Sequence, residues 1–175
     1  SNCMPGLAVR QLQRDVDTIL LNFEESASYL KQKQKCTVVG NPLRGGFGAI
    51  SREVAREKVG IAPDETFVLC YAGSLGSSTV NAAVLRAVSE LIDRYPKARF
   101  LLSSGTRNYE AARAQLEAYG LQSNPRVSLQ PYIYNMADQM AAADVVISRA
   151  GAMSLSELSR MGKASIIVPS PYVAD

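Results

Sequence analysis

Short apolar segments alternate with amphipathic segments from residue 67 onward, and this alternation leaves the chain few folds to adopt. The apolar segments have the length of strands and lack the regular polar positions of a half-exposed strand. In the amphipathic segments, apolar residues recur at helical spacing until a glycine or proline ends the pattern. The predicted strands are residues 67–71, 99–103, 127–129, 144–148 and 164–168, and the predicted helices are residues 80–92, 108–119, 135–142 and 152–161. The pattern predicts an α/β fold, a parallel sheet with helices on both faces.

The first 65 residues are less regular. They predict a helix at residues 7–16, a strand at 18–23, a short helix at 24–30, a strand at 36–39 and a helix at 47–59. Before the last of these, a run of glycine, asparagine and proline breaks the pattern as a linker would. We therefore expect residues 1–40 to close one domain, residues 41–46 to link the domains, and residues 47–175 to form a second, more complete domain.

Composition excludes several classes of protein. The 175 residues contain no histidine, so this chain cannot itself carry a Ser-His-Asp triad or bind zinc through imidazole. A net charge of +3 is too small to indicate a nucleic-acid partner. Three dispersed cysteines, Cys3, Cys36 and Cys70, favour buried thiols over a disulfide framework. No apolar run approaches the roughly 20 residues of a membrane-spanning helix, and the start shows no signal-peptide pattern, so any membrane contact would be peripheral.

The first candidate site is the turn Gly73-Ser74-Leu75-Gly76, between a predicted strand and a predicted helix. Open parallel sheets place ligands at the carboxyl ends of strands, and glycines let backbone N–H groups approach an anion. The turn lacks the G-x-G-x-x-G pattern, which disfavours a nicotinamide cofactor. Two interpretations remain open, a phosphate-binding loop and a tight turn without a ligand.

A second such turn runs from Arg149 through Gly151 to Ser154. The N–H groups of Met153 and Ser154 would be available to a phosphate, and Glu157 lies one turn further, where a carboxylate can accept hydrogen bonds from both ribose hydroxyls. The alternative for Glu157 is an acidic residue that complements the helix dipole.

Two other segments carry polar or aromatic candidates. Arg44 lies in the predicted linker, where it would either neutralise a diphosphate in an interdomain cleft or remain in solvent. Tyr132 and Tyr134 flank Ile133 after a strand, where a base could contact the backbone of Ile133. The alternative is that both tyrosines are ordinary residues at the rim of the core.

Four segments together resemble one family. They are Asn41-Pro42-Leu43-Arg44, Gly73-Ser74-Leu75-Gly76, residues 131–136 (PYIYNM) and residues 149–158 (RAGAMSLSEL), and the closing residues 168–175 (VPSPYVAD) agree with them. The chain is similar over essentially its whole length to the MurG family of N-acetylglucosaminyltransferases. Three positions depart from the family's usual residues: Leu43 for valine, Ala72 for glycine, and Asn135 for aspartate.

The resemblance implies a GT-B enzyme, in which two Rossmann-like domains face a cleft and the C-terminal one binds UDP-N-acetylglucosamine. It implies inverting transfer of N-acetylglucosamine to a lipid-linked muramoyl-pentapeptide in peptidoglycan synthesis, without metal or cofactor. Ile133 would contact uracil through its backbone, Met136 would line the nucleotide pocket, and Glu157 would hold the ribose hydroxyls. The diphosphate would be surrounded by Arg44, Ser74, Met153 and Ser154, and Gly73, Gly76 and Gly151 would shape the turns.

The family's acceptor-binding half, with a glycine-rich loop and a histidine, does not appear in this chain. The resemblance therefore implies that the lipid-linked acceptor and a peripheral contact with the cytoplasmic face of the bacterial plasma membrane belong to that missing half. Residues 1–40 would be the end of the N-terminal acceptor domain, and residues 47–175 would be the C-terminal UDP-sugar-binding domain, truncated at its C-terminal end. We expect this chain alone to bind the donor nucleotide but to lack catalytic residues. The alternatives are another GT-B UDP-sugar transferase, such as a diacylglycerol glycosyltransferase, a sugar-nucleotide epimerase, and a non-catalytic nucleotide-sugar-binding module.

Overall fold

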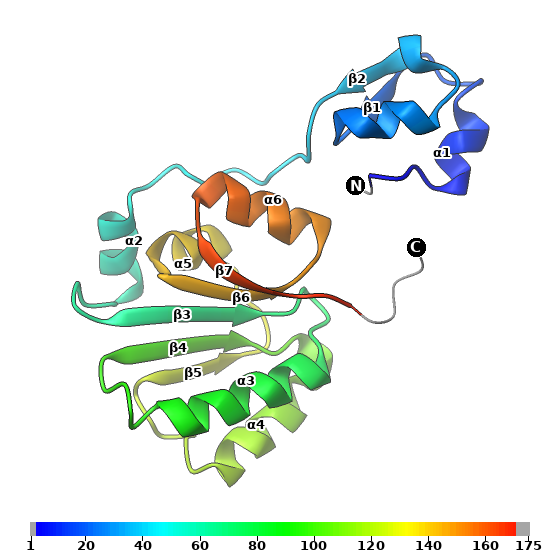
Figure 1. The fold of residues 1–175 in the computed structure, drawn as a ribbon. Coiled ribbons are helices and arrows are strands. Elements are labelled where there is room, and N and C mark those ends of the chain that lie inside the picture. The colour runs from blue at the N-terminus through cyan, green and yellow to red at the C-terminus, as the bar shows by residue number, and fades with distance from the viewer. Residues whose placement is uncertain (1–2, 171–175) are drawn as a thin grey trace. The chain divides into compact units, whose positions relative to one another are not determined.

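The computed structural model describes residues 3–170, and the chain divides into two compact units, Ser1–Arg44 and Gly45–Asp175 (Figure 1). The division falls inside the segment that the sequence predicts as a linker. The assignment of the first unit to an acceptor domain stays a prediction, and the resemblance at residues 171–175 lies outside the described residues.

The first unit holds a small two-stranded parallel sheet. Its elements are α1 (Leu7–Leu12), β1 (Ile19–Leu21), the 3-10 helices η1 (Glu24–Tyr29) and η2 (Lys33–Lys35), and β2 (Cys36–Val38). The helix predicted at residues 7–16 ends early, at Leu12. Gln13 is buried there, and its side-chain oxygen accepts the N–H groups of Lys31 (2.7 Å) and Gln32 (3.2 Å). That pair of bonds ties the end of α1 to a distant segment and turns the chain out of the helix.

The second unit is built on a five-stranded parallel sheet of order β5-β4-β3-β6-β7. Its elements are α2 (Arg52–Val59), β3 (Thr66–Tyr71), α3 (Ser78–Leu91), β4 (Ala98–Ser103), η3 (Thr106–Asn108), α4 (Tyr109–Ala118), β5 (Val127–Gln130), α5 (Met136–Ala142), β6 (Val145–Arg149), α6 (Ala152–Met161) and β7 (Ala164–Val168). The predicted parallel sheet is confirmed.

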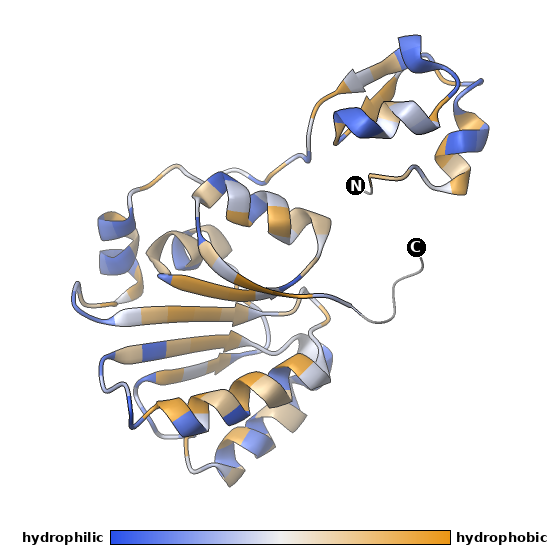
Figure 2. Ribbon diagram, in the orientation of Figure 1, coloured by the Kyte–Doolittle hydropathy of each residue, from blue (hydrophilic) through white to orange (hydrophobic). Residues whose placement is uncertain are grey.

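Helices cover both faces of this sheet, as the apolar strands predict (Figure 1). Along the central strand β3, Phe67, Leu69 and Tyr71 join a core cluster with α2, α5 and α6. Cys70, between them, joins a second cluster with α3 and α4 on the other face. Because both faces of the sheet are covered, the strands are apolar over most of their length (Figure 2). β7 ends the strand order, and its Ile166 is 56% exposed.

Two further expectations from the sequence are wrong in detail. The helix predicted at residues 47–59 begins only at Arg52, because Gly46 and Gly48 adopt positive φ and Ser51 caps the helix by accepting the N–H of Val54 (3.3 Å). Of the three cysteines, only Cys70 is buried, and burial raises the pKa of its thiol to about 12.

Asp144 links α2 to β3 at the amino-terminal edge of the sheet. Its carboxylate accepts the Phe67 N–H (2.7 Å) and bonds to the guanidinium groups of Arg52 (3.2 Å from Nε) and of the buried Arg56 (3.0 Å). Burial acts to raise the pKa of Asp144, but these bonds outweigh it and hold the pKa below its ordinary value. This ionic cluster lies at the end of the strands opposite the loops that carry the candidate site.

Candidate functional site

The order of the strands singles out one position on the sheet. The chain adds β4 and β5 on one side of β3 and then returns to place β6 on the other side. Ligands of open α/β sheets bind beyond the carboxyl ends of the strands at such a switch point. Tyr71 lies opposite both Ser103 of β4 and Ser148 of β6, and Ser103 lies opposite Gln130 of β5. The four strands therefore end at one level, and the loops that follow them share one edge.

The loop after β3 is packed closely against the loop after β4. Gly73 and Gly76 have φ of +80° and +71°, and a Cβ on Gly76 would lie 1.8 Å from the Ser104 carbonyl oxygen. Asn81 of α3 donates to that same oxygen (2.9 Å), and Asn108 donates to the Leu75 carbonyl (2.9 Å). Only glycine permits this close approach.

Ser74 is exposed on this rigid loop, and α3 begins directly after it. The side chain of Ser77 accepts the Val80 N–H (3.5 Å) and so caps the first turn of α3. The loop therefore combines a fixed backbone, an exposed hydroxyl and a helix start that is already capped.

The loop after β6 leads into α6 in a different way. The Ala150 N–H donates to the Val168 carbonyl (3.1 Å), and Gly151 is the N-cap residue. Among the described residues, no side chain caps α6. Met153 is 39% exposed in this first turn, and Ser154 and Glu157 are half-buried. The start of α6 thus presents the N–H groups of Met153 and Ser154 and the positive end of the helix dipole, and no side chain in the described part of the chain caps it.

The loop after β5 contributes backbone more than side chain. Ile133 is only 2% exposed, because its side chain packs in the core cluster of α5 and α6. Met136 is half-buried against the same cluster. Tyr134 is 92% exposed, and its ring meets that of Tyr132 edge to face, with centroids 5.0 Å apart. A ligand at this loop would therefore meet the backbone of Ile133 and a pair of aromatic rings.

The structure brings six of the predicted site residues to the same edge of one sheet: Ser74, Ile133, Met136, Met153, Ser154 and Glu157. The three glycines named with them, Gly73, Gly76 and Gly151, lie in the loops of that edge. Arg44 is exposed and belongs to the first unit, so its contact with a diphosphate stays a prediction.

Sequence reasoning missed two polar groups beneath these loops. Tyr71 and Ser148, the last buried residues of neighbouring strands, are register partners and are 5% and 0% exposed. The sequence pattern marks both only as parts of apolar strands. The available signal was position, because a hydroxyl at the carboxyl end of a central strand lies next to the ligand edge.

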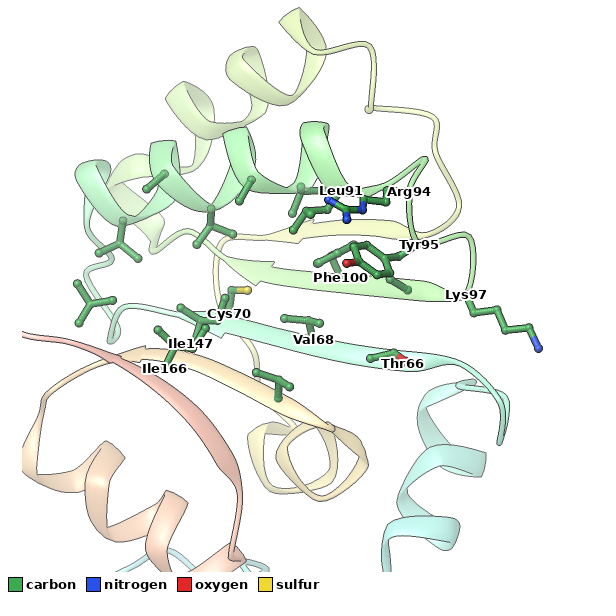
Figure 3. Close-up of a pocket in the computed structure, with 18 of the residues that line it drawn as sticks. Thr66, Val68, Cys70, Leu91, Arg94, Tyr95, Lys97, Phe100, Ile147 and Ile166 are labelled. Atoms are coloured by element: carbon green, nitrogen blue, oxygen red, sulfur yellow. The ribbon is translucent and has the colours of Figure 1, made fainter.

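A large apolar cavity lies elsewhere. It has a volume of about 780 Å³ and lies against the α3 face of the sheet, among residues such as Val68, Phe100, Ile147 and Ile166 (Figure 3). Lys97 extends from one end of it and pairs with Asp64 at 2.8 Å. None of the predicted site residues lines this cavity. Its walls are apolar and suit neither a phosphate nor a ribose.

Residues 3–170 contain no group of three cysteine or acidic side chains that could hold a metal ion. Over the same residues, every helix is too short or too polar to cross a bilayer.

Comparison with known proteins agrees with this geometry. The family model described as the glycosyltransferase family 28 C-terminal domain matches residues 67–175. Two relatives are named UDP-N-acetylglucosamine--N-acetylmuramyl-(pentapeptide) pyrophosphoryl-undecaprenol N-acetylglucosamine transferase. The one from Caldicellulosiruptor saccharolyticus is 40% identical over 99% of this chain, and the one from Acetivibrio thermocellus is 37% identical over 98%.

This chain spans 46% of the length of each of those relatives. The crystal structure of MurG from Acinetobacter baumannii has the same fold, with a TM-score of 0.64 at 24% identity, and the match covers 99% of this chain and 45% of that one. The predicted GT-B architecture of the second unit is thereby confirmed.

Proposed function

The chain belongs to the glycosyltransferase family 28 C-terminal domain family, and from this premise we propose that it carries the donor site of an N-acetylglucosaminyltransferase. The donor is UDP-N-acetylglucosamine, and the acceptor is the lipid-linked muramoyl-pentapeptide that the names of its relatives describe. The observation that carries the proposal is the start of α6, which no side chain of residues 3–170 caps, beside the loop of Ser74 at the switch point of the sheet.

The proposed roles follow from the chemistry of each group. The diphosphate lies at the start of α6, where the N–H groups of Met153 and Ser154 and the hydroxyl of Ser74 donate to it. Glu157, one turn into the same helix, accepts the two ribose hydroxyls with its two carboxylate oxygens. Uracil lies against the loop after β5, where Ile133 offers its backbone and Met136 lines the pocket.

For Arg44 the proposal rests on the family resemblance, in which this linker arginine neutralises the diphosphate. A guanidinium binds phosphate oxygens through paired N–H donors, which suits this role.

In the proposed reaction, the bond from the anomeric carbon to the UDP oxygen breaks while the acceptor's 4-hydroxyl oxygen attacks from the opposite face. The configuration inverts, the hydroxyl loses its proton, and UDP leaves. Negative charge grows on the leaving diphosphate, and fixed N–H dipoles that point at this charge stabilise it without a metal. The base that takes the proton is proposed to lie in the acceptor half, as are the acceptor site and the contact with the cytoplasmic face of the plasma membrane.

Isothermal titration of the chain with UDP, UDP-N-acetylglucosamine, UDP-glucose and a GDP-sugar tests this proposal. Uridine nucleotides should bind and the GDP-sugar should not, and Glu157→Ala should weaken UDP binding about tenfold or more, the value of a lost charged hydrogen bond. Glu117→Ala, on the exposed side of α4, is the matched control and should bind as the parent chain does. Equal affinity for uridine and guanosine nucleotides, or an unchanged Glu157→Ala, would refute the donor site described here.

A further inference from the structure

The loops after β3 and β4 interlock at the carboxyl edge of the sheet. A Cβ on Gly76 would lie 1.8 Å from the Ser104 carbonyl oxygen, and a Cβ on Gly105 would lie 2.3 Å from the Leu75 carbonyl oxygen. Both glycines have positive φ, +71° and +79°. Each loop therefore occupies space that a side chain of the other loop would need, and only glycine allows this contact.

Two asparagine side chains bridge the same loops in a reciprocal way. Asn81, near the start of α3, is 2% exposed and donates to the Ser104 carbonyl (2.9 Å). Asn108, directly before α4, donates to the Leu75 carbonyl (2.9 Å). An asparagine at the start of each helix thus holds the loop that leads into the other helix.

Asn108 makes this bond at the expense of its own helix. It is the N-cap residue of α4, and asparagine is among the side chains that cap helices best. Its side chain nevertheless accepts none of the N–H groups of α4, a helix that the structure describes in full. The amide nitrogen bonds instead to Leu75, 33 residues away in the sequence. The side chain therefore stabilises the loop of Ser74 and not the helix that follows it.

We propose that Asn108 is a positioning residue for the donor site, which fixes the Ser74 hydroxyl for the diphosphate by holding the Leu75 carbonyl. This inference rests on the proposed function, because it concerns the same nucleotide. Ser74 directly precedes Leu75 and is exposed. With the Leu75 carbonyl bonded and Gly76 packed against Ser104, the backbone on the C-terminal side of Ser74 is held before a ligand arrives.

The other side of Ser74 depends on the same anchor. Gly73 has φ of +80° and no described atom within 4 Å of its Cβ position, so packing does not hold it. The Gly76 N–H donates to the Gly73 carbonyl (3.1 Å), which closes the turn on itself. The turn is therefore tied to the sheet edge mainly through Leu75 and Gly76. A loop that is ordered beforehand loses less conformational entropy when a ligand binds, so the bond from Asn108 favours binding without touching the nucleotide.

The test compares UDP with uridine, which lacks the diphosphate, in amide NMR titrations of the parent chain and of Asn108→Ser. Serine caps helices as well as asparagine does, but it is too short to keep the bond to Leu75. The variant gains a cap as it loses that bond, so its unfolding midpoint should change little. Its dissociation constant for UDP should rise about threefold to tenfold, the value of one hydrogen bond. Its affinity for uridine should stay that of the parent chain, because uridine makes no bond to Ser74.

A double-mutant cycle with Ser74→Ala supplies the second readout, since residues that act through each other are not additive. In the Ser74→Ala background, Asn108→Ser should have no further effect on UDP binding. Asn124→Ser is the matched control. The side chain of Asn124 also holds a loop, by accepting the Arg126 N–H (3.0 Å), but it lies before β5, at the opposite edge of the sheet. This variant should bind UDP as the parent chain does.

Three results would overturn the positioning role alone. They are parent-level UDP binding by Asn108→Ser, an equal loss of affinity for UDP and uridine, and an undiminished effect of Asn108→Ser in the Ser74→Ala background. Failure of the parent chain to bind UDP would overturn the proposed function instead.

Discussion

The loops after β3 and β6 start at the same level of the sheet but are built in opposite ways. In the β3–α3 loop, Gly76 packs against Ser104 and Gly105 of the neighbouring loop, and Asn108 donates to the Leu75 carbonyl. Ser77 caps the helix that follows. The β6–α6 loop ends in Gly151, and no described side chain caps the helix.

This difference indicates that the two loops have different roles in ligand binding. A rigid loop can hold the Ser74 hydroxyl in one place, because its position is decided before any ligand arrives. An uncapped helix start leaves N–H groups that a phosphate can satisfy, so it gains more from ligand binding than a capped one. The predictions that follow alter one loop at a time.

The largest effect is expected from Gly76→Ala. A Cβ at Gly76 would lie 1.8 Å from the Ser104 oxygen, at a φ that L residues avoid. The free energy of unfolding should fall by about 3 kcal/mol, about 1 from the positive φ and about 2 from overpacking. Urea denaturation measures it. Gly120→Ala is the control, because Gly120 has a similar φ (+68°) but no atom near its Cβ position, and about 1 kcal/mol is expected there. Equal losses would show that the loop is not held by this close packing.

Asp144→Asn should be nearly as destabilising but should leave the loops alone. It leaves the buried guanidinium of Arg56 without its carboxylate, which should lower stability by about 3 kcal/mol while UDP binding to the folded chain is kept. Because the pKa of Asp144 is depressed in the folded state, its contribution is present above the ordinary value of 3.8 and is lost as the pH falls through the lower folded-state value. As the pH falls below the ordinary value of 3.8, the stability of the variant should therefore fall less steeply than that of the parent chain. A variant curve parallel to the parent's would contradict this assignment.

Gly151→Asp should add a side-chain cap to the start of α6. Gly151 has φ of −82° and ψ of 142°, which any residue adopts, and a Cβ there would lie 3.8 Å from the Ser154 hydroxyl oxygen, the nearest atom of the described residues. The aspartate should cap α6 and stabilise the chain by a few tenths of a kcal/mol, while its charge repels the diphosphate and weakens UDP binding about tenfold. Gly151→Ser, which caps without charge, should weaken binding less. Unchanged UDP affinity in Gly151→Asp would mean that the diphosphate does not lie at this helix.

Ser77→Ala should have the smallest effect and should act on stability. It removes the cap of α3, which should lower the free energy of unfolding by about 1 kcal/mol in thermal or urea unfolding. Ser78→Ala, at the next position, which does not cap the helix, should change the free energy of unfolding by much less. A loss at Ser78 as large as that at Ser77 would argue against the cap.

The sequence predicted the sheet and its helices well because periodicity and glycine turns are local signals. It also predicted which loops lie together, since parallel strands end at one edge. It failed where contacts distant in sequence decide the outcome. Gln13 ends α1 by bonding to Lys31 and Gln32, and Tyr71 pairs in the sheet with Ser148 of β6, two contacts that no spacing along the chain indicates. The late start of α2 is different, because Ser51 was a readable cap signal.

The central claim is that UDP binds at the carboxyl edge of the sheet, between the β3–α3 loop and the start of α6. Backbone amide NMR of the isotope-labelled chain, titrated with UDP, tests it residue by residue. The account predicts saturable shifts of the Ser74, Ile133, Met153 and Ser154 amides, with little change at Val68 and Ile147 in the apolar cavity. Shifts confined to that cavity, or no saturable shift at the four amides, would contradict it.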